Sequence, residues 1–557
     1  MSFFDHLNLS YWKNVALSCA IVVLALLSAC NPAPKYVKPS MPAPVAYKET
    51  GPQEFKEGKG WKIAQPGDDK LRSNWWELYN DPVLNTLEEQ VSTGNQSLAV
   101  SEANFRSART LVASARSSLF PTIGATPSFS NTRISSTIRG TRVVAGGGST
   151  SSSSAATNNY NFPLDVSYTV DFWHRIRNTI AANAFSAQAS AADVATALLS
   201  LQSELATDYF EVRAIDAQES ILQDTLKNYG ASLNLTIALY RAGIDSEQDV
   251  TQAEVQLDTA NAQLTDLGTS RAQFEHAIAM LIGKSPANFT LPPGNFNPNP
   301  PPVPVALPSV LLERRPDIAA FERQVASANA QIGVARAAYY PNVTLSASGG
   351  FQTSSFTQWF TWPSRLWSVG PTASETLYDA GARRAQVEQT EASYDAAVAN
   401  YRQTVLTAFQ AVEDNLANLR ILNQEIDQQQ TAIASSAHYL DLALIRYKTG
   451  VDSYLNVITA QTTVLTNRET QVQTQLREMA ASVALIMALG GGWDPSQLPD
   501  MKNLLARPPA WHPGGPPMPN APTNVEAPNP PAVQPSPLVL PPYRGPVSPP
   551  ASGAAHQ

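Results

Sequence analysis

Few side chains in this 557-residue sequence have the types and spacing that catalysis requires. The six histidines are scattered, and no two of them stand at the i, i+4 spacing that places a pair of metal ligands on one helix face. No glycine-rich phosphate loop opens a helix after a strand, and no serine or cysteine lies in a recognisable nucleophile setting. We therefore expect a protein that is not an enzyme and that has no cofactor and no metal site.

The two cysteines, Cys19 and Cys30, both lie near the N-terminus. An apolar run that ends at Leu27 has the length of a signal peptide and is too short to span a membrane. The tetrapeptide Leu-Ser-Ala-Cys that closes this run resembles the lipobox of bacterial lipoproteins. We expect a signal peptide at residues 1–29 and a covalent lipid on Cys30, with an ordinary signal peptide as the alternative. Asn31 stands where an aspartate would indicate retention at the inner membrane, so the lipid points to the outer membrane.

Two polar stretches, at residues 240–253 and 447–460, share one pattern. Six identities at a constant offset of 207 relate them, which indicates an internal repeat. Each copy contains a glycine, Gly243 or Gly450, that interrupts a long helical pattern. We expect each glycine to mark a turn into a second, antiparallel helix.

The elements before these stretches are also duplicated. Residues 115–121 match residues 335–341 at an offset of 220, and each match ends a helical pattern at a proline. Residues rich in Thr, Ser, Val and aromatic side chains follow, which predicts a β-hairpin at 122–172 and another at 342–379. The offset then falls to 207, so the first half must hold 13 extra residues, and a loop rich in glycine and serine from Gly146 accounts for them.

Long helical patterns follow each hairpin, over residues 173–285 and 381–489. Apolar residues recur every seven positions from Val398 to Ile426, as in a coiled-coil seam. Residues 381–448 contain no proline, and a helix of that length extends about 100 Å. Charged and amide side chains interrupt the seam throughout, so we expect these helices to lie in water.

Composition completes the domain organisation. The net charge of -8 and a charged fraction of 15% offer no basic surface for nucleic acid. Proline-rich sequence separates the two repeats and fills the C-terminus, where it cannot bury a core. We predict a signal peptide at residues 1–29 and an extended N-terminal segment at 30–70. Repeat 1 (71–290) and repeat 2 (309–493) follow, separated by a linker at 291–308, and a disordered tail occupies 494–557.

Four candidate strands per chain cannot close a barrel alone, because strands in a membrane need every edge paired and the smallest known barrels have eight strands. The chain must therefore oligomerise if these strands span a membrane. Two copies would supply eight strands and three copies twelve, and the residues do not choose between them. Either ring would continue into a cylinder of long helices, which describes a conduit.

The motifs of the second repeat resemble those of one known family. Residues 311–318 read Leu-Leu-Glu-Arg-Arg-Pro-Asp-Ile, and residues 332–341 read Ile-Gly-Val-Ala-Arg-Ala-Ala-Tyr-Tyr-Pro. With the lipobox and the two Tyr-x-x-Gly stretches, they resemble the TolC family of outer membrane efflux channels, in its OprM-like lipoprotein branch. The resemblance implies a mostly α-helical fold with a small transmembrane β part, in which four strands per protomer contribute to a trimeric twelve-stranded β-barrel above a periplasmic α-barrel.

The resemblance also implies location and partners. A homotrimer would sit among outer membrane lipids, extend into the periplasm, and dock through a periplasmic adaptor onto an inner-membrane transporter of the RND type. Its function would be a passive conduit of a tripartite pump that exports drugs or other small molecules. The alternative is a periplasmic coiled-coil structural or adaptor lipoprotein, although an adaptor should show a single helical hairpin flanked by lipoyl-like β segments.

Family members keep the channel closed with polar links between helices. In the family, an acid after the first Tyr-x-x-Gly-like stretch bonds the equivalent tyrosine of the second repeat, or the basic residue before it. The matching positions here are Asp249, Tyr447 and Arg446, so we expect them to form a gate latch near the periplasmic mouth. Partly exposed links of this kind contribute on the order of 1 kcal/mol each, so an adaptor could break them. Solvated coiled-coil side chains with no latch function are the alternative.

The narrowest ring of the branch is usually lined by a leucine and an aspartate one turn apart. This sequence has Leu455 at the first position and Thr459 at the second, which puts an acidic ring in doubt. We expect Leu455, Asn456 and Thr459 to form a constriction with a hydrophobic pinch and a mostly neutral ring, with Asp452 and Gln252 close by.

Overall fold

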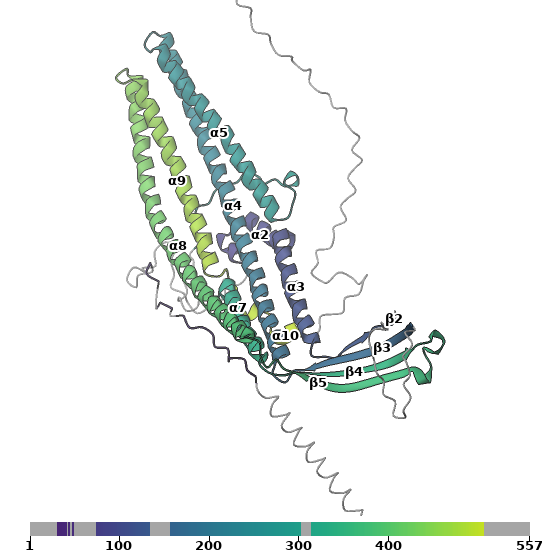
Figure 1. Cartoon of the computed structure of the whole chain (residues 1–557). Helices are drawn as coiled ribbons and strands as arrows, with labels where there is room; N and C mark the ends of the chain where they lie inside the picture. Colours follow the sequence, from purple (N-terminus) through teal and green to yellow (C-terminus); the bar gives the residue numbers. More distant parts are fainter. Residues whose placement is uncertain are drawn as a thin grey trace, which may run out of the picture. The chain divides into compact units, whose positions relative to one another are not determined.

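Each half of the chain folds as short helices, strands and a pair of long helices (Figure 1). The computed structural model describes residues 31–41, 43–44, 47–49, 74–133, 156–301 and 314–505. Cys30 and the loop predicted from Gly146 lie outside these residues. Within the described part of the chain, no helix is both long and apolar enough to cross a membrane.

The four long helices follow the predicted ranges closely. Their bounds are α4 (Arg175–Arg241), α5 (Glu247–Leu281), α8 (Ala382–Lys448) and α9 (Tyr454–Ala488). The predicted seam is buried in α8, where Val405, Val412 and Leu419 pack into the main core. Helix α9 packs against both α8 and α4, so the helices lie in the order α8, α9, α4, α5 (Figure 1).

The first repeat begins with two helices where the sequence predicts one. Helices α2 (Pro82–Gly94) and α3 (Gln96–Ser117) are separated at Asn95, which has extended backbone. The Asn95 side chain accepts a hydrogen bond from the Leu98 amide and so caps a new helix. Its amide group also donates to the Leu281 carbonyl oxygen at the end of α5, which fixes the break in place.

The second repeat opens with one helix, α7 (Pro316–Ala337). It packs against α4 of the first repeat and α8 of its own repeat. Thirteen of its residues are buried, many of them small, which allows the close approach of both neighbours. This helix therefore joins the two repeats.

Strands from both repeats form one antiparallel sheet. The strands are β1 (Thr122–Ala125), β2 (Ser128–Thr132), β3 (Thr157–Val170), β4 (Asn342–Thr353) and β5 (Arg365–Ser374). Both β1 and β2 pair with β3, and β3–β4 and β4–β5 complete the sheet. The first predicted strand is thus broken in two, at Pro127, which has no amide hydrogen to donate to a ladder.

The pairing register gives the sheet two unlike faces. Paired residues share a face, and on one face lie Ile123 with Val166, Tyr168 with Leu345, and Phe162 with Phe351. The other face carries hydroxyl and amide side chains, for example Thr122 with Ser167, Thr169 with Thr344, and Asn161 with Gln352. The sheet is therefore apolar on one side and polar on the other.

The first residues of the predicted disordered tail, up to Leu505, are folded. Residues Pro495–Gln497 form a 3-10 helix, and α10 (Met501–Leu505) packs against α3 and α4. Leu504 is buried beside Val112, and the Gln188 side chain donates to the Pro499 carbonyl oxygen at 3.0 Å. This correction has a simple cause, since Met501, Leu504 and Leu505 pack in one apolar cluster with residues of α3 and α4.

A buried charge network holds the start of the linker between the repeats. Asp216 binds both Arg213 and Arg271, at 3.0 and 2.8 Å. The two arginines donate to the carbonyl oxygens of Pro292 and Leu291 respectively, each at 2.8 Å. Because each of these charges has opposite-charge or carbonyl partners, the network positions the linker without leaving a buried charge unpaired.

Candidate functional site

Both turns between the long helices use the same backbone geometry. Gly243 and Gly450 have φ angles of +73° and +70°, in the left-handed region that glycine adopts without strain. The amides of Gly243 and Ile244 donate to the carbonyl oxygens of Tyr240 and Leu239, and the Gly450 turn repeats both bonds. These bonds satisfy the last carbonyl groups of each helix. The structure therefore places a turn at both predicted glycines.

Tyr447 connects the second turn to the first repeat. Its ring is only 3% exposed and packs against the ring of Tyr454, with centroids 5.2 Å apart. Its hydroxyl donates to the Asp245 carboxylate and lies 3.0 Å from Oγ1 of Thr236 on α4. Burial, and then the hydrogen bond to Asp245, raise the pKa of Tyr447, so the hydroxyl keeps its proton at neutral pH.

Within one chain, the partner of Tyr447 is Asp245 and not the predicted Asp249, four residues further on. Asp249 is near enough for its charge to raise the pKa of Tyr447, but its carboxylate accepts hydrogen bonds from Ser246, from the amide at 3.3 Å and from Oγ at 2.7 Å. Ser246 in turn caps α5 by accepting from the Asp249 amide. This reciprocal capping box occupies Asp249, which leaves Asp245, just outside the helix, to face Tyr447.

Arg446 also departs from the predicted latch. Its guanidinium Nε lies 2.6 Å from Oδ2 of Asp452, six residues further on in the same turn. Among the described residues Arg446 has no contact with Asp249. The pair is largely exposed, so it stabilises the turn itself only weakly. Within one chain, Arg446 therefore closes its own turn and does not link the two hairpins.

The predicted constriction residues gather near the start of α9. Leu455 is 58% exposed, Thr459 is exposed, and Asn456 is half-buried. The Thr459 hydroxyl donates to the Leu455 carbonyl oxygen at 2.9 Å, a bond within its own helix. Leu455 and Gln252 line one groove of about 520 Å³ between α9 and α5. Asp452 does not join this groove, since it lies in the turn and is bound to Arg446.

A ladder of polar contacts continues along the helices below the turns. On the buried side, Gln461 of α9 donates to Oγ of Ser232 on α4 at 2.8 Å. Further along, Gln256 of α5 donates to the Tyr229 hydroxyl at 3.0 Å and to Oγ1 of Thr462 at 3.1 Å. These contacts join α4, α5 and α9, and neutral hydrogen bonds of this type contribute about 1 kcal/mol each.

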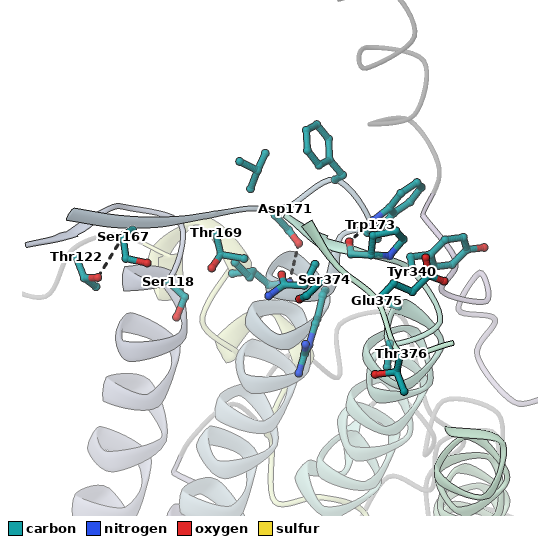
Figure 2. Close-up of a pocket in the computed structure, with 18 of the residues that line it drawn as sticks. Ser118, Thr122, Ser167, Thr169, Asp171, Trp173, Tyr340, Ser374, Glu375 and Thr376 are labelled. Atoms are coloured by element: carbon teal, nitrogen blue, oxygen red, sulfur yellow. Dashed lines mark hydrogen bonds between the residues drawn. The ribbon is translucent and has the colours of Figure 1, made fainter. Parts of the chain in front are cut away.

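A polar pocket of about 530 Å³ lies where the strands meet the helices (Figure 2). Side chains of the polar sheet face line it, among them Thr122, Ser167 and Thr169. The Asp171 carboxylate accepts from the Ile176 and Arg177 amides, at 2.9 and 3.0 Å, and so caps α4.

The same junction ties the two repeats together. The ring of Trp173 stacks on that of Tyr340, with centroids 4.5 Å apart, and its Nε1 donates to the Pro341 carbonyl oxygen at 3.0 Å (Figure 2). At the matching point of the second repeat, the Asp379 carboxylate accepts from the amides of Gly381 and Arg383. Helices α4 and α8 thus each start near an aspartate that follows a strand.

The N-terminal segment runs along helices of both repeats. Asn31 accepts a hydrogen bond from the Asn178 side chain in the first turn of α4, at 3.1 Å. Tyr36 donates to Glu322 of α7 at 2.5 Å. The amides of Lys48 and Glu49 donate to the carboxylate of Glu413 on α8, at 2.7 and 3.1 Å. We call the described residues of this segment, 31–41, 43–44 and 47–49, the N-terminal strap.

Sequence reasoning missed Asp245, Thr236 and Asp171 as contributors to these sites. A readable signal existed for the first, because Ser246-x-x-Asp249 is a capping-box pattern that assigns Asp249 to its own helix. The aspartates at 171 and 379 also stand before long helical patterns, where an acid can accept from free amides. Thr236 carried no signal, since its role depends on how α4 packs against α8 and α9.

Comparison with known proteins identifies related chains. A family profile described as outer membrane efflux protein matches residues 87–284 and 307–491, one match in each repeat. The solvent efflux pump outer membrane protein SrpC of Pseudomonas putida is 31% identical over 488 residues, which cover 86% of this chain and 99% of that protein.

Two further relatives agree with these. The probable efflux pump outer membrane protein TtgC of Pseudomonas putida KT2440 is 29% identical over 480 residues, covering 86% of this chain and 95% of that protein. The solved structure of the outer-membrane channel OprN superimposes with a TM-score of 0.74 at 29% identity, over 83% of this chain and 100% of that chain.

Proposed function

Since this chain belongs to the outer membrane efflux protein family, we propose that it is the passive outer membrane conduit of a tripartite pump. The family consists of channel proteins of efflux pumps, so the chain is a transport protein of the outer membrane. The periplasmic structural or adaptor lipoprotein considered above is therefore set aside.

The unpaired edges of the two-faced sheet are the observation that carries the proposal. Its edge strands, β1 with β2 on one side and β5 on the other, have no further partner among the described residues. Inside a membrane an unpaired edge costs several kcal/mol per exposed backbone group. A single chain therefore needs other copies of itself beside both edges.

Three copies give the arrangement that the family resemblance implies. With β1 and β2 counted as one interrupted strand, each chain supplies four strands and a trimer supplies twelve. The apolar sheet face would then contact lipid and the polar face would line the passage. The row of helices would close in the same way, with α5 of one protomer beside α8 of the next.

The strap supports a lipid anchor on Cys30. Asn31 lies against the first turn of α4, the turn that follows β3 directly. A lipid on the preceding residue would therefore be level with the end of the sheet where the membrane begins. The strap residues that follow lead away from this level along α7 and α8.

Closure would occur at the turns. Tyr447 with Asp245 holds the two hairpins of one chain together, and Leu455 with Thr459 faces the open side of α9. Asp249 and Arg446, which bind Ser246 and Asp452 within one chain, would form the expected latch with a neighbouring protomer. A periplasmic adaptor would open these turns and connect them to an inner-membrane transporter of the RND type, which would select the small molecules exported.

Single-channel recording tests the proposal directly. Purified full-length protein in planar bilayers should form trimers that conduct, and Cys30→Ser should abolish lipid attachment by mass spectrometry while the trimer still conducts. A protein that stays monomeric in detergent and never conducts would contradict the proposed conduit. In cells that lack their own channel, expression should restore resistance to exported compounds.

A further inference from the structure

The end of the sheet that lies farthest from the helices carries arginine and no acid. In the described residues, Arg133 follows β2 and Arg365 begins β5, and both are exposed. The sequence contains no Asp or Glu between residues 103 and 164 or between residues 342 and 374. Acidic side chains return only toward the helix end, at Asp165 and then Glu375. The chain as a whole has a net charge of -8, whereas this end of the sheet carries positive charge.

Arg365 lies on the apolar face of the sheet, and contacts with Trp362 fix its side chain. It pairs with Phe351 in the register, so it shares the face of Trp367 and Val369. Its Nε donates to the Trp362 carbonyl oxygen at 2.9 Å, and its guanidinium lies over the Trp362 ring. Within the described residues its two Nη groups have no acceptor. The Nε side of the planar guanidinium is thus fixed, and its two Nη groups are free to donate hydrogen bonds.

Exposed aromatic rings surround this cation. Trp362, whose ring lies against the guanidinium, is 75% exposed, and Trp367, on the same sheet face as Arg365, is 82% exposed. In the connection between β4 and β5, Phe360 stacks on Trp359 and is itself exposed. Aromatic rings with arginine or lysine beside them are typical of the boundary between membrane and water.

We propose that Arg365, braced by Trp362, binds the phosphate of a phosphorylated glycolipid in the outer leaflet. The proposal rests on the proposed function, which turns this end of the sheet outward and the apolar face toward lipid. A guanidinium with two free donors fits a phosphate in a bidentate manner. The occupant is a lipid and not a protein, because the aromatic surface is continuous with the apolar sheet face that the membrane covers.

Native mass spectrometry of the full-length protein in uncharged detergent tests this assignment. The probe is bis-phosphorylated lipid A, compared with the same lipid after removal of its phosphates. The wild type should prefer the phosphorylated lipid by about tenfold or more, the size of one hydrogen-bonded charge pair. Arg365→Gln should remove the preference, and Arg365→Lys should retain part of it because the charge stays and the fork is lost.

Two matched variants separate this site from general charge. Arg477→Gln removes an exposed arginine on α9 and should leave the lipid preference unchanged. Trp362→Leu should weaken the preference, since the guanidinium loses its brace. Equal binding of both lipids by the wild type, or an unchanged preference in both Arg365→Gln and Trp362→Leu, would overturn the assignment. Conductance in planar bilayers is measured separately. A channel that conducts but shows no preference for the phosphorylated lipid would contradict the lipid site alone. A protein that shows the preference but does not conduct would contradict the proposed conduit.

Discussion

The turns at Gly243 and Gly450 share a backbone and differ in everything that surrounds it. Tyr240 of the first turn is 44% exposed, whereas its counterpart Tyr447 is 3% exposed. The first turn has the Ser246 capping box, and the second has Ser453 at the same place without a side-chain cap. The first turn is thus stabilised by its capping box, and the second by the Arg446–Asp452 pair and by packing of Tyr447 against the other hairpin.

This difference shows how a duplicated turn can become two complementary parts. The first turn supplies the acceptor, Asp245, and the second supplies the donor, Tyr447. Each turn carries both groups, Tyr240 with Asp245 and Tyr447 with Asp452, so the link depends on which tyrosine is buried against the other hairpin and not on which residues are present. The two turns therefore differ in how shared residues are packed, and the following predictions test that asymmetry.

The largest expected effect is at the tyrosine pair. Tyr447→Ala should cost about 3 kcal/mol of local stability, because a buried ring leaves a cavity and Asp245 loses its donor. Tyr240→Ala should cost well under 1 kcal/mol, since its ring is largely exposed. Hydrogen exchange at the second turn, with entry of a large antibiotic such as vancomycin into cells, measures both. Equal effects of the two substitutions would show that the turns are equivalent after all.

The aspartate pair should give a smaller difference of the same sign. Asp245→Asn should cost about 2 kcal/mol, since it replaces a charged acceptor of the buried Tyr447 hydroxyl. The matched control is Asp452→Asn, which breaks only the exposed contact to Arg446 and should leave stability unchanged. Residual conductance of the closed channel is the measurement. A leak from Asp452→Asn that exceeded the leak from Asp245→Asn would reverse the assignment of the two turns.

The capping boxes offer an exchange experiment. Asp249→Ala should cost about 1 kcal/mol by removing the reciprocal cap of α5. Asn456, the counterpart of Asp249, stands at the same position of α9, so Asn456→Asp should install a box with Ser453 and recover a similar amount. Thermal unfolding of both variants checks this. A destabilising Asn456→Asp would mean that the second turn cannot accept local capping.

The smallest effect concerns alkaline pH. The pKa of Tyr447 is raised above its ordinary value of 10.0, so its hydroxyl is protonated both folded and unfolded until pH approaches 10. The stability that this hydroxyl contributes is fully present below pH 10 and is lost only as the pH rises above that value. Closed-channel conductance should therefore stay constant from pH 7 to 9.5. A leak that grows within this range in the wild type, but not in Tyr447→Phe, would contradict the buried setting of the hydroxyl.

Much of the fold was predictable because it repeats and because its periods are long. The seven-residue seam from Val398 defined the long helices, and the glycines at 243 and 450 defined their turns. Residues whose role depends on a single local bond were missed. Asn95 splits the first helix through its own side chain, and Pro127 interrupts the first strand.

The link between the turns was predicted at Tyr447, and within one chain its partner is Asp245 and not Asp249. Tyr447 was identified, but which carboxylate faces it depends on whether Ser246 captures Asp249 first. The partners of the strap, such as Glu322 and Glu413, could not be predicted, since hundreds of residues separate them from the N-terminus and no periodic pattern connects them. Local sequence specifies turns and caps well, and it does not specify which distant helix an extended segment will meet.

The strap also determines the order in which the molecule can assemble. Its bonds join Tyr36 to a residue 286 positions later and Lys48 to one 365 positions later. The strap can therefore dock only after α7 and α8 have been made and folded, although it leaves the ribosome before them. Contacts between such distant residues form slowly, because a long loop must close first. A segment that is synthesised early is thus among the last to be fixed.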